Sequence, residues 1–102
     1  MTTRPFAPLA HGNTVTVSAS TTSAAGTLPA AIVGGCDLRV HNATTAIAFV
    51  RWQNAAAPTA TTDDIPIPAG GVEVFEANSA AYVAVILSAG TGNVYFTVGR
   101  GI

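Results

Sequence analysis

The stretch Asn13-Thr-Val-Thr-Val-Ser-Ala-Ser20 decides the fold, because apolar and hydroxyl-bearing residues alternate along it without a break. In an extended chain successive side chains point to opposite sides, so Val15, Val17 and Ala19 share one face. The threonines and serines share the other face. This period of two predicts a strand with one face in a protein core and the other in water.

The same pattern, or a short run that is apolar on both sides, returns along the rest of the chain. It predicts strands over residues 36–41, 45–53, 72–76, 82–88 and 94–98, with residues 65–68 extended by their prolines. Residues 28–33 are expected to form an edge strand or an irregular segment, because Pro29 lacks an amide hydrogen. Residues 21–26 are expected to form a turn or loop. The segment 45–53, which is apolar on both sides, is expected inside a sheet or at a subunit contact. The segment 82–88 is also apolar on both sides.

No stretch has the residue spacing of an amphipathic helix, so the expected fold class is all-β. We expect a small β-sandwich or jelly-roll-like barrel of about six to eight short strands. Residues 13–102 are expected to form it as a single domain, which agrees with the length of 102 residues. Residues 1–12, which contain Pro5 and Pro8, are expected to form an extended N-terminal arm.

Charge is scarce in this chain. Charged residues make up 9%, there is no lysine, and the formal net charge is −1. Four scattered arginines do not form the basic stripe that neutralises phosphates, so we expect neither a nucleic acid nor an anionic membrane as partner. The single cysteine, Cys36, cannot form an intrachain disulfide, and we expect a buried free thiol in a protein made in a reducing cytoplasm.

No residue pattern points to catalysis. The two histidines, His11 and His41, lack the spacing of metal ligands, and no nucleophile motif or phosphate-binding loop is present. The acidic residues are expected to supply solubility and turn hydrogen bonds. We therefore predict no catalytic residue, no metal and no cofactor. Asn42-Ala-Thr44 matches the N-glycosylation triplet, a motif that is common by chance.

The residues with the strongest binding character are Trp52, its neighbour Arg51 and the loop of residues 54–64 that follows. A tryptophan near a loop can anchor an interface or stack on a sugar, and packing in the core is the alternative. The low charge, and the apolar strand over 82–88, predict burial against copies of the same chain. Together with the arm, these considerations select as candidate interface residues Phe6, Leu9, Arg51, Trp52, Pro58 and Tyr82.

Several short phrases of the sequence resemble small virion proteins of tailed bacteriophages. They are Leu38-Arg-Val-His-Asn42, Ala48-Phe-Val-Arg51, residues 60–70 and Val72-Glu-Val-Phe75, followed by the ending over residues 90–102. The likeness covers residues 36–102 and contains no defined site motif.

The resemblance implies a capsid decoration or cement protein, made in the cytoplasm of the bacterial host and placed on the outer capsid surface of the virion. Such proteins typically form homotrimers with β-sandwich, jelly-roll-like folds, and their partner is the major capsid protein of the phage head. Two alternatives stay open. One is another virion component from the tail, the head–tail connection or a fibre, and the other is a small carbohydrate-binding β-module.

Overall fold

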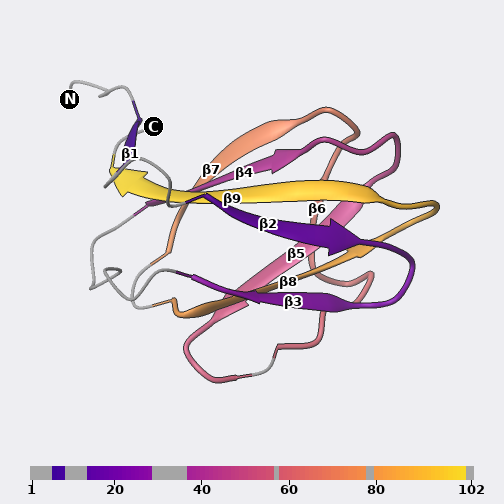
Figure 1. Cartoon of the computed structure of the whole chain (residues 1–102), viewed down its shortest axis with the longest axis horizontal. Coiled ribbons are helices and arrows are strands. Elements are labelled where there is room, and N and C mark those ends of the chain that lie inside the picture. The colour runs from indigo at the N-terminus through magenta and orange to yellow at the C-terminus, as the bar shows by residue number, and fades with distance from the viewer. Residues whose placement is uncertain (1–5, 9–13, 29–36, 57, 78–79, 101–102) are drawn as a thin grey trace.

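Two antiparallel β-sheets pack face to face in the computed structural model, which describes residues 6–8, 14–28, 37–56, 58–77 and 80–100 (Figure 1). The five-stranded sheet contains β1 (Ala7–Pro8), β2 (Val15–Ala19), β4 (Asp37–Asn42), β7 (Val72–Glu76) and β9 (Gly92–Arg100). The four-stranded sheet contains β3 (Ala24–Thr27), β5 (Ala48–Gln53), β6 (Ile65–Ile67) and β8 (Tyr82–Leu87). The predicted all-β class is confirmed. The described residues include no helix, and so none that is long and apolar enough to cross a membrane.

The order of strands follows from which of them are apolar on both sides. In the five-stranded sheet the order is β1-β9-β4-β7, and β2 pairs with β9 along the same edge as β1. In the four-stranded sheet the order is β3-β8-β5-β6, so β5 lies inside the sheet as its two apolar faces predicted, and β8 lies inside it as well. All pairs are antiparallel, with Val15 opposite Phe96 and Leu38 opposite Val98.

The core lies between the two sheets and is built from alternate residues of the strands. Val17 and Ala19 are buried while Thr16 and Ser18 are exposed, as the opening stretch predicted. Each large apolar side chain removed from water contributes about 1.5–3 kcal/mol before entropy is counted. The largest fully buried side chains of the core are Phe96, Leu38, Ile67, Leu87, Val40, Val50, Val83, Val85 and Val94.

One prediction about local structure was wrong. Residues 21–26 were expected to form a turn or loop, but the chain from Ala24 to Thr27 is strand β3, paired with β8. Gly26 lets β3 lie close over β2, because an added Cβ would come within 3.0 Å of Val17 Cγ2. Gly90 and Gly92, at the turn between β8 and β9, are both able to take a positive φ. Only Gly90 does, at 70°, whereas Gly92 begins β9 and leaves room for Thr44.

The arm is extended where it is described, and it pairs with its own chain. Ala7 and Pro8 lie opposite Arg100 and Gly99 of β9. With β1 and β3 the described residues form nine strands, more than the predicted six to eight. The expected segment 28–33, apart from Leu28, and the expected buried thiol of Cys36 lie outside the described residues.

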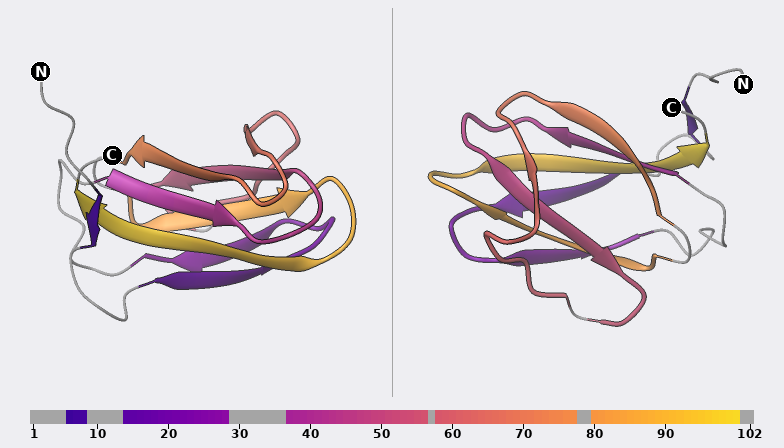
Figure 2. Two further views of the ribbon diagram at one scale, coloured as in Figure 1. Left: turned by 90° about the horizontal axis from the view of Figure 1, so that it is seen from above. Right: turned by 180° about the vertical axis from the view of Figure 1, so that it is seen from behind.

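The long loop between β5 and β6 covers the outward side of the four-stranded sheet (Figures 1 and 2). Its Pro58 and Ala60 are buried, and the Ala60 amide donates to Ser23 Oγ at 2.8 Å. Ala84 alternates with the core residues of β8 and so faces outward, yet it is fully buried. The apolar outward side of β8 is therefore partly covered within the chain, and this strand alone does not call for a second copy.

Candidate interaction surface

One end of the sandwich carries no charge. Residues 20–23, 43–47, 68–71 and 88–91 connect the strands there, on the right of Figure 1, and all of them are described. None of these residues is Asp, Glu, Lys, Arg or His. We call these four connections, with the adjoining Val72, the uncharged end. It lies opposite the end at which β9 finishes and β1 is attached.

The uncharged end exposes two large apolar side chains among many small ones. Ile47 is 43% exposed and Val72 is 41% exposed, and the only other large hydrophobic residue exposed among those described is Ile65. Ala, Gly, Pro, Ser and Thr make up the rest of the connections. Burying Ala, Gly or Pro costs no side-chain rotamer entropy, and burying Ser or Thr here removes no ionised group from water.

A buried asparagine holds two of the connections together. The side chain of Asn42 is fully buried at the end of β4. Its Nδ2 donates to the carbonyl oxygens of Ala46, Ile67 and Pro68 at 2.8, 3.0 and 3.1 Å. Its Oδ1 accepts from the Thr44 amide at 3.0 Å and from Thr44 Oγ1 at 2.7 Å. The glycosylation-like triplet is thus a structural motif that links the two sheets, and its asparagine is inaccessible in the folded chain.

Backbone hydrogen bonds tie all four connections to one another or to neighbouring strands. Leu87 N donates to Ser20 O at 2.8 Å, and Ser88 N donates to Ile47 O at 2.9 Å. Ala43 N donates to Asn93 O at 3.1 Å, and Asn42 N donates to Gly71 O at 2.9 Å. The uncharged end is consequently preorganised, so binding through it loses little backbone freedom.

The described charged residues lie elsewhere, on β4, β5, β7, the end of β9 and the loop after β5. Arg51 and Asp64 form an ion pair, with Arg51 Nη2 3.0 Å and Nε 3.1 Å from Asp64 Oδ1. Asp64 Oδ2 also accepts from the Thr61 amide at 2.8 Å. This carboxylate fastens the loop to β5, so its role is structural.

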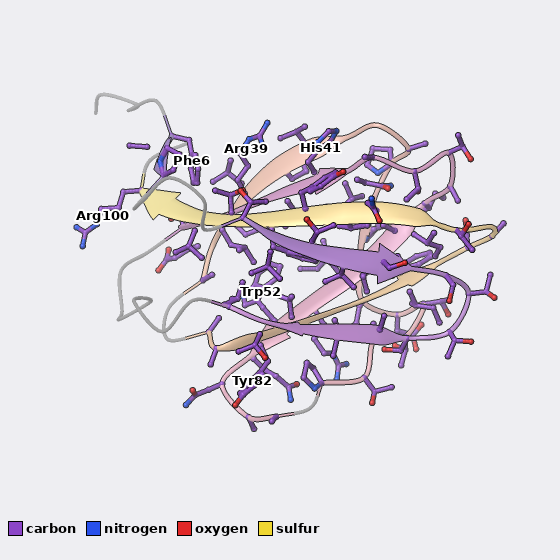
Figure 3. All side chains as sticks on the ribbon, in the orientation of Figure 1. Phe6, Arg39, His41, Trp52, Tyr82 and Arg100 are labelled. Atoms are coloured by element: carbon purple, nitrogen blue, oxygen red, sulfur yellow. The ribbon has the colours of Figure 1, made fainter. Side chains whose placement is uncertain are left out.

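The structure separates the predicted interface residues (Figure 3). Phe6 lies against Gly99 of the five-stranded sheet, where an added Cβ would come 2.6 Å from Phe6 Cζ. Trp52 points between the sheets and packs on Phe75, with ring centroids 4.9 Å apart. Of the two roles considered for Trp52, packing in the core is therefore the one that the structure shows.

Of the remaining candidates, Tyr82 lies at the far end of the four-stranded sheet from the uncharged end. Tyr82 is half-buried and lies opposite Gln53, close to Arg51 along the same sheet. Pro58 is buried and presents no surface of its own, and Leu9 lies outside the described residues. The candidate interface residues were chosen from the sequence for their large side chains, and this choice missed the uncharged end. The only sequence signal of that end is that four separate turn segments all lack charged residues.

The described residues enclose no pocket and bring no three His, Cys, Asp or Glu side chains together. No protein-family model matches the chain, and comparisons with curated proteins and with solved structures also find no match.

Proposed function

We propose that the chain is a non-enzymatic structural protein of a bacteriophage virion, a decoration or cement protein that binds the outer surface of the assembled capsid. The observation that carries the proposal is the uncharged end, rigid and edged by exposed Ile47 and Val72. The resemblance of several short phrases to small phage virion proteins is the reason for proposing the major capsid protein as partner.

The uncharged end suits a contact that must form on many identical sites. A docking surface with no ionised group has no charge to desolvate, and its small side chains lose little rotamer entropy. Apolar contact then supplies the affinity through Ile47 and Val72. Because only the assembled shell is bound, each occupied site stabilises that shell, by about 2.7 kcal/mol when the free protein is at 100 times its Kd.

The proposal includes a homotrimer, an expectation that rests on the resemblance and on the low overall charge. Since Ala84 on the outward side of β8 is already buried within the chain, the trimer contact is not assigned to that strand. Light scattering of the pure chain at micromolar concentration tests the state. A monomer with a mass of 10.2 kDa would contradict the trimer.

Co-sedimentation with capsid shells tests the function. Decoration-free capsid shells are mixed with the wild type, Ile47→Asp or Val72→Asp. We expect the wild type to pellet only when shells are present. It should stay bound to them in molar salt, because screening weakens charge pairs and leaves apolar contacts intact. Each Asp variant should bind at least about tenfold more weakly, since a charge would be buried without a partner.

Ile65→Asp is the matched control. It places the same charge at a side chain that is 40% exposed but lies in β6, outside the uncharged end. This variant should bind shells like the wild type. The proposal fails if the wild type pellets equally without shells or if moderate salt releases it from them. It also fails if Ile47→Asp, Val72→Asp and Ile65→Asp bind shells with the same affinity as one another. Binding to purified tails and not to heads would favour the other virion role.

A further inference from the structure

The outward side of the five-stranded sheet carries an aromatic pair that neither the core nor the uncharged end uses. His41 on β4 and Tyr95 on β9 lie directly opposite each other in the register. Their ring centroids are 5.8 Å apart and the ring planes differ by 31°. Both residues are half-buried, and His41 lies on the side away from the four-stranded sheet, next to Arg39 (Figure 3).

Hydroxyl groups and one guanidinium surround this pair. Thr16 on β2 lies opposite Tyr95 on the same outward side and is exposed. In the neighbouring row Thr97 lies opposite Arg39, and Thr97 Oγ1 is 2.8 Å from Thr14 Oγ1. The result is a flat row of hydroxyl, aromatic ring and aromatic ring across three adjacent strands, with further donors and acceptors beside it.

We propose that this face, which we call the Tyr95 platform, binds a neutral pyranose glycan. A pyranose has one face of C–H groups, which packs on an aromatic ring, and a rim of hydroxyls, which hydrogen-bond to side chains such as threonine and arginine. The platform offers these two chemistries side by side.

This side of the sheet suits a neutral ligand on its two aromatic rings. Arg39 is the one cation among its described residues, and Asp37 and Glu76 are the acids of the same side, facing each other across β4 and β7. These three residues lie outside the row of Thr16, Tyr95, His41 and Val72, so a neutral sugar on the rings needs no ionic partner. The Tyr95 platform borders the uncharged end at Val72, which lies opposite His41 in the register, so Ile47 and not Val72 is the residue that separates sugar binding from shell binding.

Titration followed by NMR tests the proposal on the full chain. The probes are chitohexaose, cellohexaose and maltohexaose, each added to about 10 mM, a range suited to millimolar Kd values. We expect at least one of them to shift the ring signals of Tyr95 and His41. Tyr95→Ala should weaken that binding about tenfold, the loss expected for one stacking contact of about 1.4 kcal/mol.

Two further variants separate binding from folding. Thr16→Lys adds bulk beside Tyr95 at an exposed position, so it should weaken binding with an unchanged melting temperature. Tyr82→Ala removes a tyrosine from the other sheet and should bind like the wild type. The proposal is overturned if none of the three sugars shifts the Tyr95 or His41 signals, or if Tyr82→Ala weakens binding as much as Tyr95→Ala. Ile47→Asp should keep sugar binding even where it loses shell binding.

Discussion

Replacing Asn42 should show how much of the fold depends on one buried side chain. Asn42→Ala removes five hydrogen bonds, but two of the carbonyl groups keep another donor. Ala46 O still accepts from Thr44 Oγ1 at 3.1 Å, and Pro68 O still accepts from Gly71 N at 2.8 Å. The buried Thr44 amide loses its Asn42 acceptor, at about 1–3 kcal/mol for a buried group left unpaired, and the Ile67 carbonyl loses its Asn42 donor.

The expected loss is therefore about 3 kcal/mol of the free energy of unfolding. For a domain of this size 1 kcal/mol corresponds to about 4–8 °C in melting temperature, so Asn42→Ala should melt roughly 15 °C below the wild type. Calorimetry and urea unfolding measure the two quantities. Asn54→Ala is the control, since Asn54 is exposed in the loop and should change stability by less than about 0.5 kcal/mol.

Asn42→Asp adds a dependence on pH. The new side chain has the shape of asparagine, but its ionised form cannot donate to the three carbonyl oxygens, whereas its protonated form can donate to one. The folded state therefore favours the protonated form and raises the pKa of residue 42 above the ordinary value of about 3.9 for aspartic acid. Since the folded state then binds more protons than the unfolded state, stability falls as pH rises above about 4.

The Asn42→Asp variant should accordingly be less stable at pH 7 than at pH 4, after subtraction of the wild-type change over the same range. At pH 7 it should also be less stable than Asn42→Ala, which carries no charge. The reasoning is refuted if Asn42→Ala costs less than about 1 kcal/mol, or if the Asp variant shows the same pH profile as the wild type.

Three further predictions follow from close contacts and from the ion pair. Gly92→Ala should cost about 1–3 kcal/mol, because its Cβ would lie 2.6 Å from Thr44 Cγ2, and adding Thr44→Ser should restore part of that loss in a double-mutant cycle. Gly99→Ala should displace the arm, seen as a shift of the Phe6 ring signals toward those of a free peptide, and an unchanged Phe6 spectrum would contradict the packing. Asp64→Asn should lower the free energy of unfolding by about 1 kcal/mol in low salt and by less in molar salt, because it breaks the ion pair with Arg51. The control Asp63→Asn, at an exposed position, should change that free energy by less than about 0.5 kcal/mol, and equal effects of the two variants would rule out the Arg51 contact.

Strands with a clear apolar face were predictable from the sequence, and strands without one were not. The alternation around Val15 and Val17, and the two apolar faces of residues 82–88, led to β2 and β8. Strand β3, with the sequence Ala-Ala-Gly-Thr, has no large apolar face of its own. It is a strand because β8 offers a partner and because Gly26 can approach Val17, which are tertiary facts that local propensity does not contain.

The candidate surface was hidden from the sequence for a different reason. Large side chains attract attention in a sequence, but Trp52 packs on Phe75 across the sandwich and Pro58 is buried in the loop. The uncharged end, in contrast, is assembled from four segments that are distant in the chain, and only the topology reveals that they are neighbours. A lack of charge in any one of them is unremarkable, since turns rich in Gly, Ser and Thr are common.

This composition also determines which experiment can detect the surface. Alanine scanning finds interfaces in which a few large side chains carry the affinity. Most side chains of the uncharged end are close to alanine in size, so their removal changes little contact area, and only Ile47 and Val72 have much to lose. Substitution by a charged residue does detect such a surface, because each ion that is buried without a partner carries the full desolvation penalty. A scan in which exposed Thr45, Ala69 and Ala89 are each replaced by Asp should therefore map the docking area, while the same positions tolerate Ser. If Asp at all three positions left shell binding unchanged, the shell would have to contact a different part of the molecule.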